Sequence, residues 1–430
     1  MRRITLIRLS IIIFLTISLI IPIIAYPKRS INVINESIEI QSSSSYEYEW
    51  LVTYGKEGID RGYGIIMDSL GNIYVSGFLD GAGPLCLLKY NYNGSLLWNK
   101  TWGQGEGCDI VMNDTNSIYV TGCSAGQICL LKYNSSGDLL LNKTWGSSAF
   151  EAGNGIDIDN LGNIYITGKN DDVLILLKYN ASGHLEWNKS LEVHSEGNDI
   201  VVDEIGNIYI TGYKQNGLNQ LDLCILKYNS SGNLEWEDMW GGPEYDCGSG
   251  IALGGVGNIY ITGYGVVGLG DLDLYILKYN SSGNLEWVTK WGGDEIDFGY
   301  DIKLDNFGNI YITGATGSFK KHSNIPDILL AKFDKNGNNL GFKTWGYWSG
   351  TDRGYGLVLD DLGYAYITGT MVATEMDNLW DIFLLKYDLD KIPIGTNSVI
   401  PGYNISFFSM GIGIIIVITS LIKRHKLKLH

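Results

Sequence analysis

The heptapeptide GNIYITG occurs four times without change, at residues 162–168, 206–212, 257–263 and 308–314. Close variants occupy residues 71–77 (GNIYVSG), 116–122 (NSIYVTG) and 363–369 (GYAYITG). The central tyrosines of these copies are Tyr74, Tyr119, Tyr165, Tyr209, Tyr260, Tyr311 and Tyr366. A motif that returns at a nearly constant interval is typical of a repeat architecture. The chain therefore contains seven copies of one unit, which we number as repeats one to seven.

Each repeat contains four segments with the pattern of short strands. The first is apolar and ends in Asp-x-x-Gly, as in GIDIDN from Gly155, and the second is the NIYITG segment. The third ends in Leu-Lys-Tyr and the fourth carries Leu-x-Trp, as in KYNSSGNLEW at 227–236. Asp-x-x-Gly and Asn-Ser-Ser-Gly place a glycine where a tight hairpin needs a positive φ. Each repeat is thus predicted to be a four-stranded antiparallel sheet.

Such a sheet has apolar side chains on both faces, so neighbouring sheets must cover it. The sequence predicts an all-β fold, a seven-bladed β-propeller of four-stranded blades. Repeat seven stops at KYDLDKIPIG (386–395) without a Leu-x-Trp strand, whereas YEWLVTYG (48–55) supplies one before repeat one. We therefore expect the segment around Trp50 to join the sheet that contains Tyr366 and to close the ring.

A hydrophobic segment stands at each end of the chain. Residues 1–25 have the basic and apolar order of a signal peptide, with an N-terminal membrane anchor as the alternative, and 26–45 would be a linker. The propeller would cover 46–396, followed by a linker at 397–404. Residues 405–422 form an uncharged apolar run before the basic tail 423–430, which predicts a transmembrane helix with a cytoplasmic tail. A buried core helix is the alternative for 405–422.

The predicted propeller is strongly acidic, with 22 basic and 45 acidic side chains between residues 46 and 396. Nucleic-acid binding needs basic side chains, so this balance argues against nucleic acid as a partner. It favours cations or basic partners, although an acidic surface also serves solubility. Eleven N-x-[ST] sequons fit a glycosylated extracellular surface, although Asn-x-Ser-Gly is also good turn chemistry.

The repeat resembles the β-propeller repeat family known as SBBP. The resemblance rests on Asp-x-x-Gly-Asn-Ile-Tyr-Ile-Thr-Gly, then Leu-Lys-Tyr-Asn-x-x-Gly-x-Leu-x-Trp, then Trp-Gly-Gly, over about residues 48–395. It implies a seven-bladed propeller on secreted or surface proteins, without a shared enzymatic activity. Separately, the stretch around Pro401 and Gly402, with the apolar run and basic tail behind it, resembles archaeal surface-protein sorting signals.

An acidic residue precedes the first strand of every repeat, where a propeller has the mouth of its central channel. A ring of carboxylates there would bind Ca²⁺ or a cationic ligand. Alternatively, each carboxylate accepts backbone N–H bonds and fixes its loop. The seven residues are Asp60, Glu106, Glu151, Glu196, Asp246, Asp297 and Asp352. The sequence implies no other cofactor.

The loops between second and third strands vary in length, from residues 123–127 to 213–222, 315–327 and 370–381. These loops share the face of the acidic residues, which makes this face the candidate for partner binding, with neutral length drift as the alternative. One lysine per third strand would be a ring of cations or, as we expect, a set of packed stems with solvated or paired ammonium groups. The repeated Trp and Tyr side chains are expected to pack between blades rather than bind sugar.

Catalytic motifs find little support. GCSAG at 122–126 and GYGVVG at 263–268 match nucleophile and dinucleotide patterns, but a strand rather than a helix follows each. Cys108 and Cys123 flank a predicted hairpin and are candidates for a disulfide in an oxidising compartment.

We therefore expect a non-catalytic binding or adhesion module that engages a surface protein or glycan through the acidic, variable-loop face. Its location would be the cell membrane, with the propeller on the extracellular side. The alternatives are an extracellular propeller enzyme, such as a polysaccharide lyase or a quinone-dependent dehydrogenase, and a structural component of the cell envelope.

Overall fold

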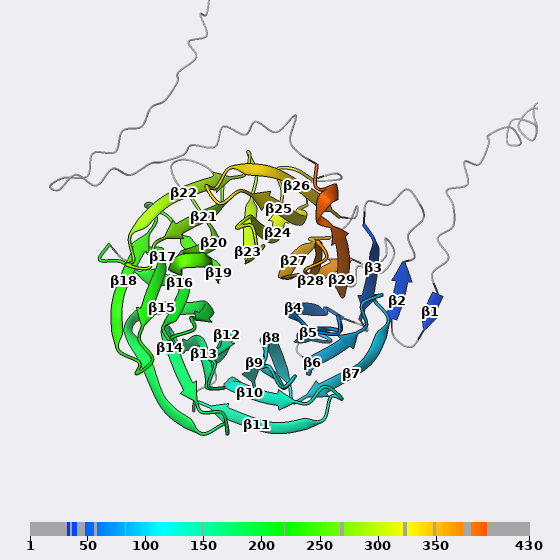
Figure 1. Cartoon of the computed structure of the whole chain (residues 1–430), viewed down its shortest axis with the longest axis horizontal. Helices are drawn as coiled ribbons and strands as arrows, with labels where there is room; N and C mark the ends of the chain where they lie inside the picture. Colours follow the sequence, from blue (N-terminus) through cyan, green and yellow to red (C-terminus); the bar gives the residue numbers. More distant parts are fainter. Residues whose placement is uncertain are drawn as a thin grey trace, which may run out of the picture.

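The computed structural model describes residues 32–34, 37–40 and 48–393, except 56–57, 82, 148–149, 219, 267–270, 321–324, 347–349 and 373–379. In these residues the chain is almost entirely β-strand, apart from two short 3₁₀ segments, η1 (Gly255–Gly257) and η2 (Leu389–Lys391). The all-β expectation is confirmed. The strands form antiparallel sheets that stand side by side around a central axis (Figure 1).

Four sheets have four strands each, and each corresponds to one repeat. Repeat one forms β4 (Arg61–Met67), β5 (Ile73–Phe78), β6 (Leu85–Tyr90) and β7 (Leu96–Trp102). Repeat two forms β8 (Gly105–Met112), β9 (Ile118–Ser124), β10 (Gln127–Tyr133) and β11 (Leu139–Trp145). Repeat five forms β19 (Asp246–Leu253), β20 (Ile259–Gly265), β21 (Asp273–Tyr279) and β22 (Leu285–Trp291). Repeat six forms β23 (Asp297–Leu304), β24 (Ile310–Thr316), β25 (Asp327–Phe333) and β26 (Asn339–Trp345).

Repeats three and four share one long strand. Their seven-stranded sheet contains β12 (Glu151–Ile158), β13 (Ile164–Asn170), β14 (Val173–Tyr179), β15 (Leu185–Val202), β16 (Ile208–Gln215), β17 (Leu221–Tyr228) and β18 (Leu234–Trp240). The first part of β15 pairs with β14 and the second part pairs with β16. Here Leu191 and Glu192 replace the Trp-Gly that ends the fourth strand elsewhere. Without that glycine the strand continues into the next repeat.

Repeat seven forms β27 (Arg353–Leu359), β28 (Tyr364–Val372) and β29 (Trp380–Asp388), and its fourth strand comes from the other end of the domain. This strand is β3 (Trp50–Tyr54), which pairs with β29 in antiparallel register, Trp50 opposite Lys386 and Tyr54 opposite Ile382. The expectation that the segment of Trp50 joins the sheet of Tyr366 is confirmed.

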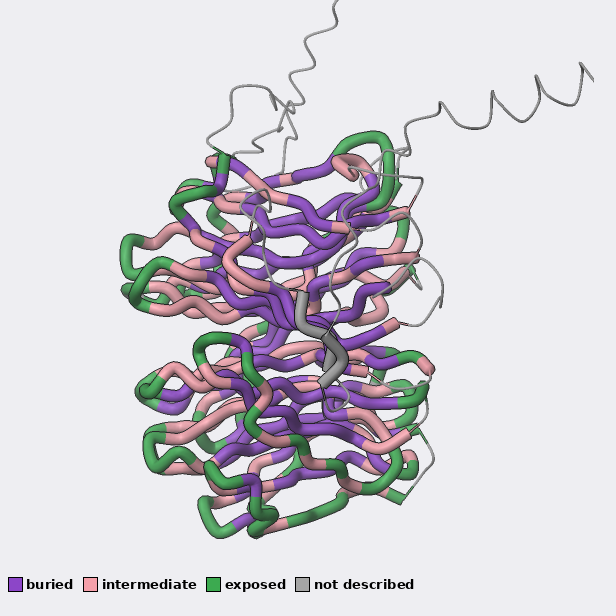
Figure 2. The backbone as a smooth tube through the Cα atoms, turned by 90° about the vertical axis from the view of Figure 1, so that its right-hand side faces the viewer, coloured by how far each residue is buried: buried purple, intermediate pink, exposed green. Residues whose placement is uncertain are grey.

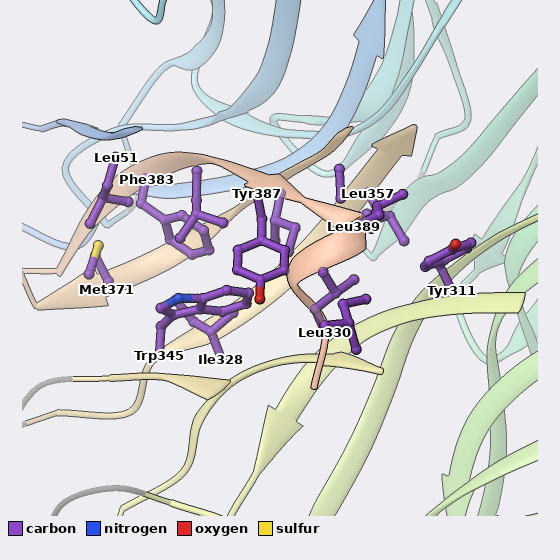
Figure 3. Close-up of a cluster of buried hydrophobic side chains, with 14 residues drawn as sticks. Leu51, Tyr311, Ile328, Leu330, Trp345, Leu357, Met371, Phe383, Tyr387 and Leu389 are labelled. Carbon is purple, nitrogen blue, oxygen red and sulfur yellow. The ribbon is translucent and has the colours of Figure 1, made fainter. Parts of the chain in front are cut away.

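Both faces of β3 are buried. Leu51 belongs to a cluster with Trp345 and Phe383, which joins repeats six and seven (Figure 3). Val52 belongs to a second cluster with Ile65 and Leu384, which joins repeats seven and one. Repeats one and seven therefore pack directly against each other.

Two further strands extend this sheet beyond β3. They are β2 (Ser37–Ile40), which pairs with β3, and β1 (Asn32–Ile34), which pairs with β2. These seven strand residues lie within the segment 26–45 that the sequence analysis assigns to a linker. The edge of β3 that faces away from β29 is open, and its unpaired backbone groups can bond to a nearby extended segment.

The core lies between neighbouring sheets rather than at one centre. Each buried cluster combines the third strand of one repeat with the first and second strands of the next, as Leu223 and Ile225 pack with Ile251 and Ile261. Figure 2 shows buried residues along the strands and exposed residues at the turns. The packing agrees with the prediction that each sheet is covered by its neighbours.

The lysine of each third strand lies over the tyrosine of the neighbouring second strand. The distance from Nζ to the ring centroid is 4.9–5.7 Å in all seven pairs, which are Lys89–Tyr74, Lys132–Tyr119, Lys178–Tyr165, Lys227–Tyr209, Lys278–Tyr260, Lys332–Tyr311 and Lys386–Tyr366. Three of these lysines also pair with a glutamate of the fourth strand, as Lys227 does with Glu235 at 3.0 Å. The structural interpretation of the lysine set is confirmed.

Both terminal hydrophobic segments, 1–25 and 405–422, lie outside the described residues, as do Pro401 and Gly402. Within the part of the chain that the structure describes, no helix has the length and apolar character needed to cross a membrane.

Candidate binding site in the central channel

The first strand of every repeat carries a β-bulge at the same place. The register shifts between a glycine and the second residue after it, for example between Gly62 and Gly64, and between Gly299 and Asp301. A bulge leaves one extra residue and turns its side chain in a new direction. The seven extra residues are Tyr63, Cys108, Asn154, Asn198, Ser249, Tyr300 and Tyr355, and all line one central cavity of about 1100 Å³.

Tyrosines form a continuous arc on one side of this cavity. The ring centroids of Tyr63 and Tyr355 are 5.0 Å apart, and those of Tyr355 and Tyr300 are also 5.0 Å apart. Phe298 stacks on Tyr300 at 5.7 Å, and Tyr264 contacts Phe298 edge-on at 4.8 Å. Burial raises the pKa of Tyr63 and Tyr300 well above the usual tyrosine value, so both hydroxyls stay neutral and can donate hydrogen bonds.

Two arginines stand beside this arc, one residue before the bulge glycine of repeats one and seven. The Arg61 guanidinium lies 5.8 Å from the ring centroids of Phe78 and Trp380, and its Nη1 donates to the Tyr63 hydroxyl at 3.4 Å. Nε of Arg61 is buried and has no hydrogen-bond partner among the described residues. Arg353 lies 5.8 Å from the Phe298 ring.

The opposite side of the cavity is polar, and its groups are already paired. Asn154 Nδ2 donates to Glu196 Oε1 at 2.8 Å, and the Tyr213 hydroxyl donates to Glu196 Oε2 at 2.9 Å. Asn198 Nδ2 donates to the Gly248 carbonyl at 2.8 Å. The cavity is therefore asymmetric, with tyrosine rings along one side and hydrogen-bonded asparagine side chains along the other.

Deeper in the channel, aspartates tie neighbouring repeats together. Asp109, Asp199 and Asp301 stand at the same position in repeats two, four and six, where repeats one, three, five and seven have glycine. Each accepts a backbone N–H from the following repeat, at Ile156, Ile251 and Leu357, over 2.8–2.9 Å. Lys303 Nζ donates to Asp301 Oδ1 at 2.7 Å. Burial raises the pKa of Asp199 to about 7, with Asp301 acting in the same direction and Lys303 against it.

The seven acidic residues expected to form one ring occupy two different positions. Five of them lie two residues before the bulge glycine and are buried, namely Asp60, Glu151, Asp246, Asp297 and Asp352. Glu106 and Glu196 lie one residue before it, in the position that Arg61 and Arg353 fill elsewhere. Successive side chains of a strand point to opposite faces, so the carboxylates of the two sets point in different directions. A single ring of seven carboxylates is therefore not formed.

The five buried carboxylates accept backbone N–H groups. Asp60 Oδ1 accepts from Asp80 at 2.8 Å, Asp246 Oδ2 accepts from Gly242 at 2.7 Å, and Asp297 Oδ2 accepts from Gly293 at 3.0 Å. Glu151 likewise accepts the backbone N–H of Ser147, and Asp352 accepts that of Val372. Their geometry agrees with the alternative that they fix the loops. The described residues contain no group of three or more His, Cys, Asp or Glu side chains arranged to hold a metal ion.

A second aspartate, buried or partly buried, accompanies three of these carboxylates and was not predicted. Asp222 of repeat four lies beside Asp246, and both carboxylates fill the space next to Gly241. The same arrangement places Asp273 and Asp297 beside Gly292, and Asp381 and Asp60 beside Gly55. The sequence signal is an aspartate at the start of the third strand combined with one at the start of the next first strand.

Cys108 and Cys123 do not form the predicted disulfide, and all six cysteines are free. The bulge explains the difference, because Cys108 is the extra residue and the register partner of Cys123 is Glu106. Burial raises the pKa of both thiols above the usual cysteine value.

The loops between second and third strands share the face of the buried acidic residues, as expected. Ser318, in the loop after β24, donates from Oγ to Asp297 Oδ2 at 2.7 Å. Parts of the two longest loops, residues 321–324 and 373–379, lie outside the described residues. We call this side of the domain the mouth face, because the first strands begin there.

Comparisons with known proteins support the fold. The SBBP family model, described as a β-propeller repeat, matches residues 286–320. A solved structure titled "Streptogramin B lyase structure" is 13% identical, with a TM-score of 0.51, and covers 79% of this chain and 99% of that chain. A structure titled "Structure of U3-55K" is 9% identical, with a TM-score of 0.52, and covers 78% of this chain and 98% of that chain. No curated protein matches. The chain therefore contains a β-propeller repeat and has a propeller-like all-β fold.

Proposed function

We propose that the protein is a seven-bladed, closed β-propeller that acts as a non-catalytic binding module on the outside of the cell membrane. The pairing of β3 with β29 and the packing of repeat one on repeat seven support closure. The apolar runs at 1–25 and 405–422 support an extracellular domain held at the membrane. If Pro401 and Gly402 belong to a sorting signal, the run at 405–422 is exchanged for another anchor.

The ligand that best fits the channel is a glycan that carries carboxylate groups. The observation that carries this proposal is the arc of Tyr63, Tyr355 and Tyr300 with Arg61 and Arg353 beside it. Tyrosine rings cover the apolar face of a sugar while their hydroxyls bond to sugar oxygens. The planar fork of an arginine binds a carboxylate through two hydrogen bonds. A cavity of about 1100 Å³ has room for several sugar units.

Calorimetric titration of the purified full chain tests the ligand class. A uronic-acid oligosaccharide should bind at least tenfold more tightly than a neutral glucose oligosaccharide of the same length. Arg353→Gln should remove this preference, and Tyr300→Ala should weaken both ligands. Lys335→Gln, in the hairpin turn at 334–337 on the other face, is the control and should change neither. Equal binding of both sugars by the native chain would rule out recognition of the carboxylate.

An extracellular propeller enzyme and a structural envelope component remain the alternatives. An enzyme needs catalytic groups that converge from non-equivalent positions, whereas the bulge residues that line the cavity come from one position of each repeat. Turnover of the uronic-acid oligosaccharide during the titration would favour the enzyme. Absence of binding by any sugar or surface protein would favour the structural role.

A further inference from the structure

The face opposite the mouth carries a ring of exposed apolar side chains. They stand in the turns between first and second strands, two residues after the aspartate that begins each turn. Five large apolar residues are 79–86% exposed there, namely Leu70, Leu161, Ile205, Phe307 and Leu362, and these are the most exposed large apolar residues among the described ones. Thr115 and Val256 stand at the corresponding positions of repeats two and five.

These side chains are held outward by their turns. The backbone N–H of each of the five donates to the aspartate Oδ1 two residues earlier, at 2.9–3.1 Å. The other oxygen of the same aspartate accepts from the tyrosine hydroxyl of the second strand at 3.0–3.2 Å, as in Asp159 and Tyr165. That tyrosine lies under the lysine of the third strand. The turn is therefore rigid, and its apolar residue cannot fold back onto the sheet.

We call these five exposed apolar residues the tips, and those of repeats one and seven lie close together. Leu70 of repeat one and Leu362 of repeat seven line the same groove of about 490 Å³ on this face. Ile205 lines the end of the central cavity that lies away from the tyrosine arc. Large exposed apolar residues gathered on one face mark a contact surface.

Both ends of the propeller leave from this same face. The N–H of Leu389, after β29, donates to the carbonyl of Gly363 in the turn of repeat seven at 2.9 Å. The N–H of Glu49, before β3, donates to the carbonyl of Lys386 at 3.0 Å. Only eleven residues, 394–404, separate Pro393 from the apolar run at 405–422. Fully extended, these residues span at most about 40 Å.

We propose that this face rests on the lipid bilayer, with the five apolar tips inserted among the headgroups. The proposal rests on the membrane tether of the proposed function, because the short connection keeps this face, and not the mouth face, next to the membrane. Exposed apolar side chains gain free energy at the boundary between headgroups and acyl chains. The acidic domain would be repelled by an anionic surface, so the lipid partner is zwitterionic. The tyrosine-lined mouth then faces away from the cell.

Site-specific photocrosslinking of the full chain tests this orientation. The chain is reconstituted into phosphatidylcholine vesicles, with the photoreactive residue benzoylphenylalanine placed at Leu70, at Leu362 or, as the control, at Leu218. Leu218 is a matched control because it is 78% exposed and also follows an Asx turn, its N–H donating to Asn216 Oδ1 at 2.8 Å, but it lies on the mouth face. Attached lipid is measured by mass spectrometry, and flotation of the vesicles is measured separately.

We expect the chain to float with the vesicles, and lipid attachment at positions 70 and 362 to exceed that at 218 at least tenfold. Flotation with equal attachment at all three positions would overturn the orientation but leave the tether intact. Failure to float would overturn the tether and the orientation with it. In native membranes, attachment of a protein in place of lipid at positions 70 and 362 would overturn the lipid assignment in favour of a protein partner.

Discussion

Val52 and Leu384 are register partners across the pair of β3 and β29, although almost the whole domain lies between them in the sequence. The pair lies in the cluster that joins repeats seven and one. No disulfide joins the two ends of the domain. The pairing of β3 with β29 and the two buried clusters beside it therefore stabilise the contact between the two ends.

The contribution of β3 can be measured by truncating Leu51, which is 3% exposed between repeats six and seven. We expect Leu51→Ala to reduce the free energy of unfolding by about 2–5 kcal/mol, as for other buried leucines. Leu97→Ala on β7 is the control, because Leu97 is half exposed, and it should cost less than about 1 kcal/mol. Denaturant unfolding measures both, and equal losses would show that β3 does not seal the domain.

The fold could be predicted from the sequence because the same pattern occurs seven times along the chain, once in each repeat. The tyrosine of GNIYITG and the lysine of Leu-Lys-Tyr meet in every repeat, so their packing followed from the period of the strands. The channel could not be predicted in the same way. A strand without a bulge would place Tyr63 and Tyr300 on the opposite side, and the bulge shifts every residue before it by one position.

The same shift explains the acidic residues. Asp60 and Glu106 are both acidic residues near the start of a first strand, but Glu106 stands one position nearer its bulge glycine and reaches Arg61 and Tyr63 instead of a loop. The signal that separates them is the spacing to the bulge glycine, because Asp60 lies two residues before Gly62 and Glu106 lies one residue before Gly107. The aspartate pairs were missed because each pair is assembled from two repeats.

Stability should increase as the pH falls from 8 to 5. Burial raises the pKa of Asp157 and Asp246 to about 6 and that of Asp199 to about 7. A carboxyl group with a raised pKa binds its proton more tightly in the folded state than in the unfolded state. Its contribution to the free energy of unfolding is therefore complete below the unfolded pKa and is lost as the pH rises through the folded pKa. The melting temperature should be a few degrees higher at pH 5 than at pH 8.

Asp199→Asn should flatten this dependence between pH 5 and 8, because it removes the group that titrates nearest neutrality beside Asp109, Asp301 and Lys303. Asp334→Asn is the control. Although partial burial acts in the other direction, hydrogen bonds from Asn338 and Asn336 lower the pKa of Asp334, so its contribution changes only below pH 4. A flattening in both variants, or in neither, would contradict the assignment to the channel.

The hydroxyl of Tyr165 should contribute to stability through its bond to Asp159 Oδ2, which is 3.0 Å long. Tyr165→Phe leaves the ring under Lys178 but removes this hydrogen bond, at a cost of about 0.5–1.5 kcal/mol in the free energy of unfolding. Tyr260 provides the comparison, because Gly254 stands where five repeats have the aspartate and has no side chain to accept the bond. Tyr260→Phe should therefore cost markedly less, and an equal cost would assign the effect to the ring environment.

The glycine after the tryptophan of the fourth strand is explained by the carboxylates that it adjoins. A Cβ on Gly241 would lie 2.5 Å from Asp246 Oδ2 and 3.0 Å from Asp222 Oδ1, so the carboxylates would have to shift to admit it. We expect Gly241→Ala to lower the free energy of unfolding by about 1–3 kcal/mol, the usual cost of overpacking. Gly217→Ala is the matched control, since a Cβ there meets nothing within 4 Å and the substitution should be neutral. Because the strain arises from the acidic pair, adding Asp222→Ala to Gly241→Ala should recover part of the loss. A double variant as unstable as the sum of its parts would show that the backbone, rather than the carboxylates, requires this glycine.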